Sequence, residues 1–227
     1  MTDFVIAPPV VTHIPVATGG VFPVRRVYCV GRNYAEHARE MGSDPNREAP
    51  FFFSKPGNAI TTSSLVAYPP ATQNLHHEVE LVLALGQGGR DLSPESALET
   101  VYASGVGVDL TRRDLQAEAK AAGRPWDMAK GFDQSGPVGT LVPGPVPQSG
   151  KISLSVNEVP RQSGDVADMI WSSAEIIAHL SRLVELAPGD LIFTGTPAGV
   201  GPVQPKDILS ASIDGLPSLE FRMGEAG

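Results

Sequence analysis

The chain has 227 residues, a formal net charge of -8 and a single cysteine, Cys29. A chain of this length forms one or two domains and can bury a large core. The acidic balance and the lack of Lys/Arg runs argue against nucleic acid or an anionic membrane as a partner. No apolar run reaches the ~18 residues of a membrane helix, and the N-terminus does not resemble a signal peptide. With no intrachain disulfide possible, we expect a cytoplasmic protein.

Glycine and proline are frequent, with 24 and 21 residues respectively. This composition predicts many turns and short elements rather than long helices. Residues 1–23 contain several prolines and no helical periodicity, so we expect an extended N-terminal arm. One catalytic domain is expected to follow over residues 24–227, because the sequence shows no internal linker or repeat.

The first elements expected in this domain are short. Residues 26–30, apolar from Val27 onward, predict a short strand. Asn33 and Glu36 form a capping-box pattern, which predicts a helix over residues 34–41. The aromatic run at residues 51–53 predicts a second strand.

Two glutamates next to each other on one predicted strand face are the most informative feature of the sequence. Residues 79–85 predict a buried strand. Because side chains alternate across a sheet, Glu78 and Glu80 point to the same face. Carboxylates this close repel each other unless a cation lies between them. The pair therefore suggests a divalent-cation site, and the alternative is a solvent-exposed face of an edge strand.

The elements after this strand predict where a third carboxylate would come from. Ser93 and Pro94 predict the start of a helix that runs to about residue 104. A short apolar strand follows, and Thr111 and Asp114 then predict the capped start of a further helix that ends near residue 123.

Asp109 ends the short strand and is the natural third carboxylate. Three carboxylates with water make an all-oxygen site, which suits Mg²⁺, Mn²⁺ or Ca²⁺ better than Zn²⁺. The alternative is that Asp109 belongs only to the turn before the helix. Of the two histidines at positions 76 and 77, only His76 shares the face of the glutamates, and we expect it to support the site rather than bind a metal.

Other residues could supply acid–base chemistry. His37 and Glu40 are three residues apart on a predicted helix, which is the geometry of a carboxylate that orients an imidazole base. A solvated surface pair is the alternative. Lys130 lies among apolar residues and could stabilise an oxyanion or extend to solvent from a strand edge. The loop at residues 194–197 resembles a backbone nest that could hold a carboxylate.

The C-terminal half completes an α+β pattern dominated by sheet. Residues 151–156 and 191–193 predict strands. Ser172 and Glu175 form a capping box before a helix over residues 173–186, whose apolar residues recur at helical spacing. Short strands with intervening short helices predict a mixed α+β fold.

Taken together, these segments resemble the fumarylacetoacetate hydrolase family over about residues 24–223. The motifs that carry the likeness are YCVGRNYAEH (28–37), FSKP (53–56), HEVEL (77–81), DLTRRDLQ (109–116), WDMAK (126–130) and GDLIFTGTP (189–197). Runs at residues 4–9, 51–53, 112–116 and 132–135 resemble the bacterial fumarylpyruvate hydrolases of gentisate breakdown.

The resemblance implies a mostly β, mixed-sheet β-roll with short peripheral helices, and a homodimer. It implies Mg²⁺ or Mn²⁺, with Ca²⁺ as a substitute. The implied metal ligands are Glu78, Glu80 and Asp109. The implied catalytic residues are His37 and Glu40 as a water-activating dyad and Lys130 at the oxyanion. The residues implied to contact substrate or water are Arg113, Gln116 and Thr196.

The implied reaction is the hydrolysis of the C–C bond of an acylpyruvate, above all fumarylpyruvate to fumarate and pyruvate. The alternative within the family is oxaloacetate decarboxylation or cleavage of another acylpyruvate. The alternative from another class is a metal-binding module without catalysis. A fumaryl arm carries a second carboxylate, for which Arg32, Lys55 and Arg161 are candidate cationic partners.

Overall fold

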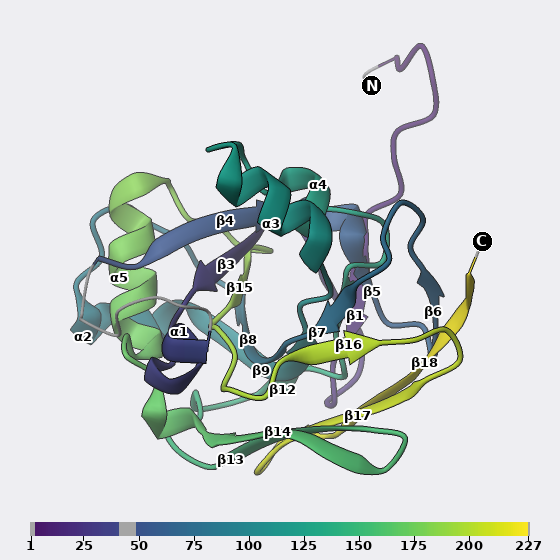
Figure 1. Cartoon of the computed structure of the whole chain (residues 1–227). Helices are drawn as coiled ribbons and strands as arrows, with labels where there is room; N and C mark the ends of the chain where they lie inside the picture. Colours follow the sequence, from purple (N-terminus) through teal and green to yellow (C-terminus); the bar gives the residue numbers. More distant parts are fainter. Residues whose placement is uncertain (1–2, 41–48, 227) are drawn as a thin grey trace.

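Two sheets that face each other form the body of the protein (Figure 1). The computed structural model describes residues 3–40 and 49–226. The first sheet has six strands in the order β12 (Val142–Pro143), β9 (Val101–Val108), β8 (Val79–Leu85), β15 (Leu191–Phe193), β3 (Val27–Gly31) and β4 (Phe51–Lys55). Strand β3 runs parallel to β15, whereas the other neighbouring pairs are antiparallel, so the sheet is mixed.

The second sheet has five strands. Their order is β14 (Val159–Asp165), β13 (Lys151–Val156), β17 (Ile208–Ile213), β18 (Leu219–Ala226) and β6 (Leu65–Tyr68). Alternate residues of both sheets point inward and form the main core, which includes Leu81, Leu83, Ile152, Leu154 and Phe221. Smaller pairings join β10 (Thr111–Arg112), β7 (Leu75–His77) and β16 (Gly201–Val203), and also β5 (Ile60–Thr61) and β11 (Gly136–Pro137).

The helices are short and lie at the periphery (Figure 1). They are α1 (Ala35–Glu40), α2 (Pro94–Ala97), α3 (Arg113–Ala121), α4 (Asp127–Lys130) and α5 (Ser173–Leu183). The 3-10 turns are Gly57–Ala59, Leu98–Thr100 and Val166–Asp168. The predicted α+β fold, dominated by mixed sheet with short helices around it, is confirmed. In the described part of the chain, every helix is too short or too polar to cross a lipid bilayer.

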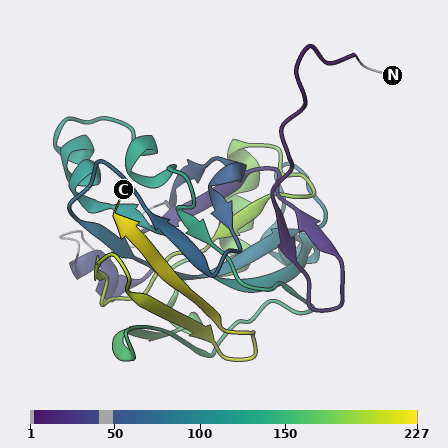
Figure 2. The same cartoon turned by 90° about the vertical axis from the view of Figure 1, so that its right-hand side faces the viewer.

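The predicted N-terminal arm has two parts in the structure. Residues 3–12 carry no strand or helix and project away from the body in both views (Figures 1 and 2). Strands β1 (His13–Pro15) and β2 (Val21–Pro23) then form a hairpin. Its buried residues Ile14 and Phe22 belong to a second core cluster on the outer face of the six-stranded sheet. The separation of residues 1–23 from a catalytic domain stays a prediction.

Several predicted element boundaries are wrong. The helix predicted over residues 93–104 ends at Thr100, because Val101 and the residues after it pair with β8 as strand β9. Thr111 does not cap α3; it lies in β10, and its hydroxyl donates to the Asp109 carbonyl oxygen at 3.3 Å. The capping box of Ser172 and Glu175 is confirmed, although α5 ends at Leu183 because Val184 is extended.

Candidate active site

The register of two strands brings three carboxylates together. In the antiparallel pair β8–β9, Val79 lies opposite Val108, and the Asp109 N–H donates to the Glu78 carbonyl oxygen at 2.8 Å. Asp109 therefore faces Glu78, and Glu80 follows two residues farther along the same face. Oxygen atoms of the three carboxylates all lie within 4.8 Å of one another, and all three residues are buried.

Three cations surround two of these carboxylates. Lys130 donates to Glu78 at 2.8 Å and to Asp109 at 2.7 Å. The Lys55 ammonium lies 2.8 Å from the other oxygen of Asp109, and Arg113 forms an ion pair with Glu78. Among the described residues no cation pairs with Glu80, which accepts a hydrogen bond of 2.6 Å from the Gly195 N–H.

The uneven distribution of cations separates the acidities of the two glutamates. Burial raises the pKa of Glu80 well above its usual value, and the nearby Asp109 and Glu78 carboxylates raise it further. Burial acts in the same direction on Glu78, but the charges of Lys130 and Arg113 hold its pKa below the usual value. Burial would lower the pKa of Lys130, but Asp109 and Glu78 raise it, so this side chain is a fixed positive charge.

These residues fit a hard divalent cation. The donor set is three buried carboxylates, and Mg²⁺, Mn²⁺ and Ca²⁺ prefer oxygen ligands. Glu80 is the strongest single indication, because a buried carboxylate without a cationic partner is costly. A divalent cation held by Glu78, Glu80 and Asp109 would supply the missing positive charge.

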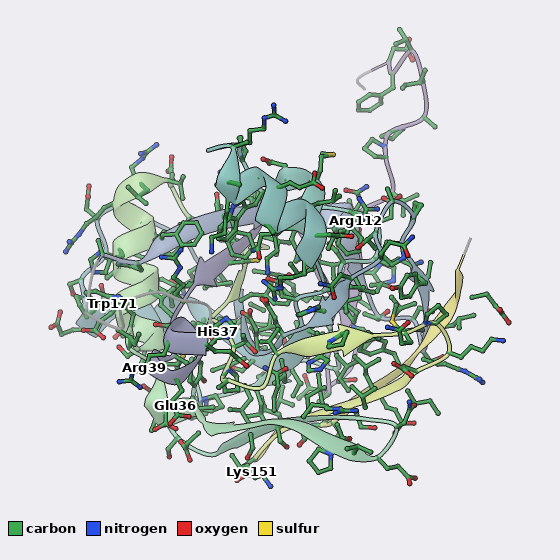
Figure 3. The ribbon with its side chains drawn as sticks, viewed as in Figure 1. Glu36, His37, Arg39, Arg112, Lys151 and Trp171 are labelled. Atoms are coloured by element: carbon green, nitrogen blue, oxygen red, sulfur yellow. The ribbon has the colours of Figure 1, made fainter. Side chains whose placement is uncertain are left out.

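The predicted dyad is formed on α1. His37 Nδ1 lies 3.3 Å from Glu40 Oε2, and the Gly199 N–H lies 3.3 Å from both oxygens of Glu40. His37 is buried and lies on the inner side of the helix, whereas Glu36 and Arg39 lie on its outer side (Figure 3). Because Nδ1 faces Glu40, Nε2 of His37 is left to act in the cavity.

Asn33 holds α1 in place by contacts other than the predicted cap. Its amide nitrogen donates to the carbonyl oxygens of Trp171 at 2.9 Å and Thr194 at 2.8 Å. Its amide oxygen accepts from the Trp171 N–H at 2.8 Å. The prediction that Asn33 caps the helix is therefore wrong, because these backbone groups saturate its side chain. The predicted end of this helix at residue 41 lies outside the described residues.

A cavity opens above the carboxylates and collects most of the predicted site residues. Those that line it are His37, Glu78, Glu80, Arg113, Gln116, Lys130 and Thr196. Asp109 lies beneath the cavity floor and Glu40 lies behind His37, so neither lines it. An aromatic wall of Phe51, Phe53 and Trp126 was not predicted; the Phe51 and Trp126 rings meet edge to face at 5.0 Å between centroids.

Each nitrogen of the Arg113 guanidinium has a protein partner. It pairs with Glu78, donates to Gln116 Oε1 at 2.5 Å and donates to His76 Nδ1 at 3.4 Å. Gln116 therefore uses its oxygen for Arg113 and turns its NH₂ group to the cavity. His76 Nε2 in turn donates to Asn74 Oδ1 at 2.8 Å. His76 thus supports the site through Arg113 and lies outside the carboxylate cluster.

This arrangement makes stability depend on pH. Burial and the neighbouring Arg113 lower the pKa of His76 to about 4. An unfolded histidine titrates near pH ~6.5, so between these values the unfolded chain binds more protons and stability falls as the pH falls. Full linkage would give about 2.5 kcal/mol between pH 7.5 and 4.5, and solvent screening of the partly exposed ring reduces this. We therefore expect His76→Gln to recover no more than about 2 kcal/mol of the stability lost over this range, measured by denaturant unfolding. The same substitution at the exposed His13 should leave the loss unchanged.

The cationic residues around the cavity differ from the sequence candidates. Lys55 is fully buried against Asp109 and Ser135 and does not line the cavity, so it cannot meet a distal substrate carboxylate there. Arg161 is exposed and also lies outside the lining. Arg32 lines the cavity, and so does Lys120. Lys120 was not predicted, because a lysine near the end of a helix is usually solvated.

Comparison with known proteins shows the family of this chain. The family model for the C-terminal domain of fumarylacetoacetate (FAA) hydrolase matches residues 26–223. The chain belongs to the fumarylacetoacetate hydrolase family. It is 42% identical over 203 residues to the mitochondrial oxaloacetate tautomerase of Bos taurus, covering 88% of this chain and 91% of the relative. It is also 42% identical over 186 residues to a fumarylpyruvate hydrolase of a Ralstonia species, covering 81% of this chain and 97% of the relative.

A solved member of the family carries the same fold. The crystal structure of fumarylpyruvate hydrolase from Pseudomonas aeruginosa, in complex with Mn²⁺ and pyruvate, matches with a TM-score of 0.95 and 48% identity. The match covers 98% of this chain and 100% of that structure. The family β-roll predicted from the sequence motifs is therefore confirmed, and the presence of Mn²⁺ in that relative agrees with the all-oxygen cluster described above.

Proposed function

We propose that this protein hydrolyses the C–C bond of an acylpyruvate, with fumarylpyruvate as the preferred substrate and fumarate and pyruvate as products. The observation that carries the proposal is that one cavity joins the His37–Glu40 dyad to the buried carboxylate cluster. A metal-binding module without catalysis has no use for a histidine oriented by a carboxylate. The 42% identity to the fumarylpyruvate hydrolase of a Ralstonia species supports the hydrolase activity. The Mn²⁺–pyruvate complex of the Pseudomonas aeruginosa enzyme supports the pyruvyl half of the substrate.

In this proposal His37 activates water. Glu40 accepts from Nδ1–H and so leaves Nε2 free to take a proton from a water molecule in the cavity. The resulting hydroxide adds to the distal 4-carbonyl of the substrate. A divalent cation bound by Glu78, Glu80 and Asp109 would bind the pyruvyl oxygens and stabilise negative charge on them.

The remaining steps use fixed charges and the same histidine. The Lys130 ammonium lines the cavity and can donate to the oxygen of the former 4-carbonyl. The C3–C4 bond then breaks, its electron pair stays with the pyruvyl fragment, and His37 returns its proton to C3. Gln116 and Thr196 line the cavity with hydrogen-bond donors that can hold the pyruvyl carboxylate.

The mouth of the cavity favours a substrate with a second negative charge. Arg32 and Lys120 are exposed residues that line it beside the aromatic wall. We expect Arg32→Gln and Lys120→Gln each to raise KM for fumarylpyruvate by about three- to tenfold, because a partly exposed charge pair contributes about 1 kcal/mol. The KM for acetylpyruvate, which lacks the distal carboxylate, should not change. Equal effects on both substrates in steady-state kinetics would show that neither cation meets the distal arm.

The proposal as a whole is tested by steady-state kinetics on fumarylpyruvate, acetylpyruvate and oxaloacetate, with Mg²⁺, with Mn²⁺ and after metal removal. We expect metal-dependent hydrolysis that is fastest with fumarylpyruvate. The second candidate is a reaction of oxaloacetate, either decarboxylation or tautomerisation, which the 42% identity to the bovine oxaloacetate tautomerase favours. Turnover of oxaloacetate with no cleavage of either acylpyruvate would select this second candidate.

We also propose that the protein is a homodimer that acts in the cytoplasm. Light scattering of the purified protein tests the dimer.

A further inference from the structure

Gln162 is a buried amide that no step of the proposed reaction uses. It lies on β14 in the five-stranded sheet, only 1% exposed, and it reaches across to the six-stranded sheet that carries the carboxylates. Its oxygen lies 3.1 Å from the Val79 N–H and 2.9 Å from His77 Nδ1. Its nitrogen lies 2.8 Å from Thr196 Oγ1 and 2.8 Å from the Pro197 carbonyl oxygen.

The two backbone contacts fix which way this amide faces. The Val79 N–H can only donate, and the Pro197 carbonyl can only accept. If the amide were flipped, its NH₂ group would face the Val79 N–H, donor against donor, and its oxygen would face the Pro197 carbonyl, acceptor against acceptor. Losing both hydrogen bonds in a buried position would cost too much free energy. The oxygen of Gln162 therefore faces Val79 and His77, and its NH₂ group faces Pro197 and Thr196.

This orientation fixes the hydrogens of two further side chains. Because Gln162 Oε1 is an acceptor, His77 must carry its proton on Nδ1. His77 Nε2 is buried and has no hydrogen-bond partner among the described residues. Because Gln162 Nε2 is a donor, Thr196 Oγ1 accepts from it, and the hydroxyl hydrogen must point elsewhere. Thr196 lines the cavity, so its hydrogen is available to an acceptor there.

We propose that Gln162 is a positioning residue that keeps the Thr196 hydroxyl as a hydrogen-bond donor to a carboxylate oxygen of a bound 2-keto acid. The inference rests on the proposed function, because that function places the pyruvyl carboxylate beside Thr196. The Gln162 amide holds the loop after β15 at a fixed distance from β8, since it bonds to Pro197 on one side and Val79 on the other. Gln162 does not line the main cavity, so it acts through Thr196.

A double-mutant cycle with pyruvate as the probe tests the proposal. The Mn²⁺-loaded protein is titrated calorimetrically, as wild type and as the variants Gln162→Met, Thr196→Val and the pair. A hydrogen bond to a charged group is worth about tenfold or more in affinity, so we expect each single variant to weaken pyruvate binding by about tenfold. The double variant should bind no more weakly than Thr196→Val alone, and Thr196→Ser, which keeps the hydroxyl, should bind like wild type.

Control measurements separate this role from a general loss of stability. Ser181→Ala removes a buried hydroxyl of α5 that bonds to Leu92 and Ala178, all three outside the cavity lining, and it should leave pyruvate affinity unchanged. The ¹⁵N spectrum of the wild-type imidazoles gives a readout that needs no ligand and no turnover: His77 should be protonated on Nδ1.

Three outcomes would overturn the proposal. The first is an unchanged pyruvate affinity in Gln162→Met. The second is a double variant that binds pyruvate about tenfold more weakly than Thr196→Val alone. The third is a His77 ring protonated on Nε2. The proposed function fails separately, if the wild type cleaves no acylpyruvate while the affinity cycle and the His77 spectrum behave as expected.

Discussion

Replacement of His37 by alanine is expected to lower kcat for acylpyruvate hydrolysis by about 10²–10⁴-fold, which is the usual contribution of a general base. The imidazole of His37 lines the cavity and its Nδ1 faces Glu40, whereas Glu40 does not line the cavity. Glu40 therefore cannot replace His37 as the base. The KM should change little, because the proposed mechanism assigns His37 to the attacking water and not to the substrate carboxylate. Initial rates with saturating Mn²⁺ and fumarylpyruvate give the measurement.

The matched control is Arg39→Ala on the same helix. Arg39 is exposed on the outer side of α1, so its loss should leave kcat within about twofold. Glu40→Gln should give an intermediate loss, because the amide still positions the ring but no longer stabilises an imidazolium. If the His37→Ala protein decarboxylates oxaloacetate at the wild-type rate, that reaction does not use the dyad. Full hydrolytic activity in His37→Ala would remove the dyad from the mechanism.

Replacement of Glu80 by glutamine should have opposite effects on stability and on activity. The amide oxygen can still accept the Gly195 N–H, so the local backbone contact is kept. A buried carboxylate with a raised pKa and no cationic partner among the described residues opposes folding near pH 7. Its removal is therefore expected to raise the Tm of the metal-free protein. Mn²⁺ affinity should fall by more than about 100-fold, and turnover should be lost with it.

These effects are measured by calorimetric titration with Mn²⁺ and by thermal unfolding in chelator. Glu99→Gln is the control, since Glu99 lies in a 3-10 turn outside the carboxylate cluster and the cavity lining. It should change neither Mn²⁺ affinity nor turnover. A Glu80→Gln protein that binds Mn²⁺ as tightly as wild type would show that Glu80 is not a metal ligand.

The carboxylate cluster was predictable because a strand alternates its side chains. Glu78 and Glu80 share a face for any register, and Asp109 joins them once the apolar run before it pairs with β8. The short helices and the capping box of Ser172 also follow from local patterns. The helix predicted over residues 93–104 failed because pairing with a buried strand outweighs helix propensity from Val101 onward.

The supports of the cluster could not be predicted in the same way. Lys55 follows an aromatic strand, and nothing in its neighbours indicates that its ammonium turns inward to Asp109. Gln162 lies 84 positions after Glu78, on a strand whose polar residues suggest an exposed surface, and only the packing of two sheets brings it to His77. Long-range contacts of this kind depend on the whole fold and leave no periodic signal in the sequence.

The loop from Thr194 to Gly199 bonds to three parts of the candidate site at once. The N–H groups of Gly195 and Gly199 donate to Glu80 and Glu40, and Thr196 accepts from Gln162. One short segment therefore links the carboxylate cluster, the His37–Glu40 pair and Gln162. A substitution there disturbs all three at once. Arg32, Lys120 and the aromatic wall also line the cavity, and they come from separate segments that take part in none of these three bonds. Under the proposed function, a change of acyl group calls for substitutions in those segments, while the groups that the Thr194–Gly199 loop holds stay in place.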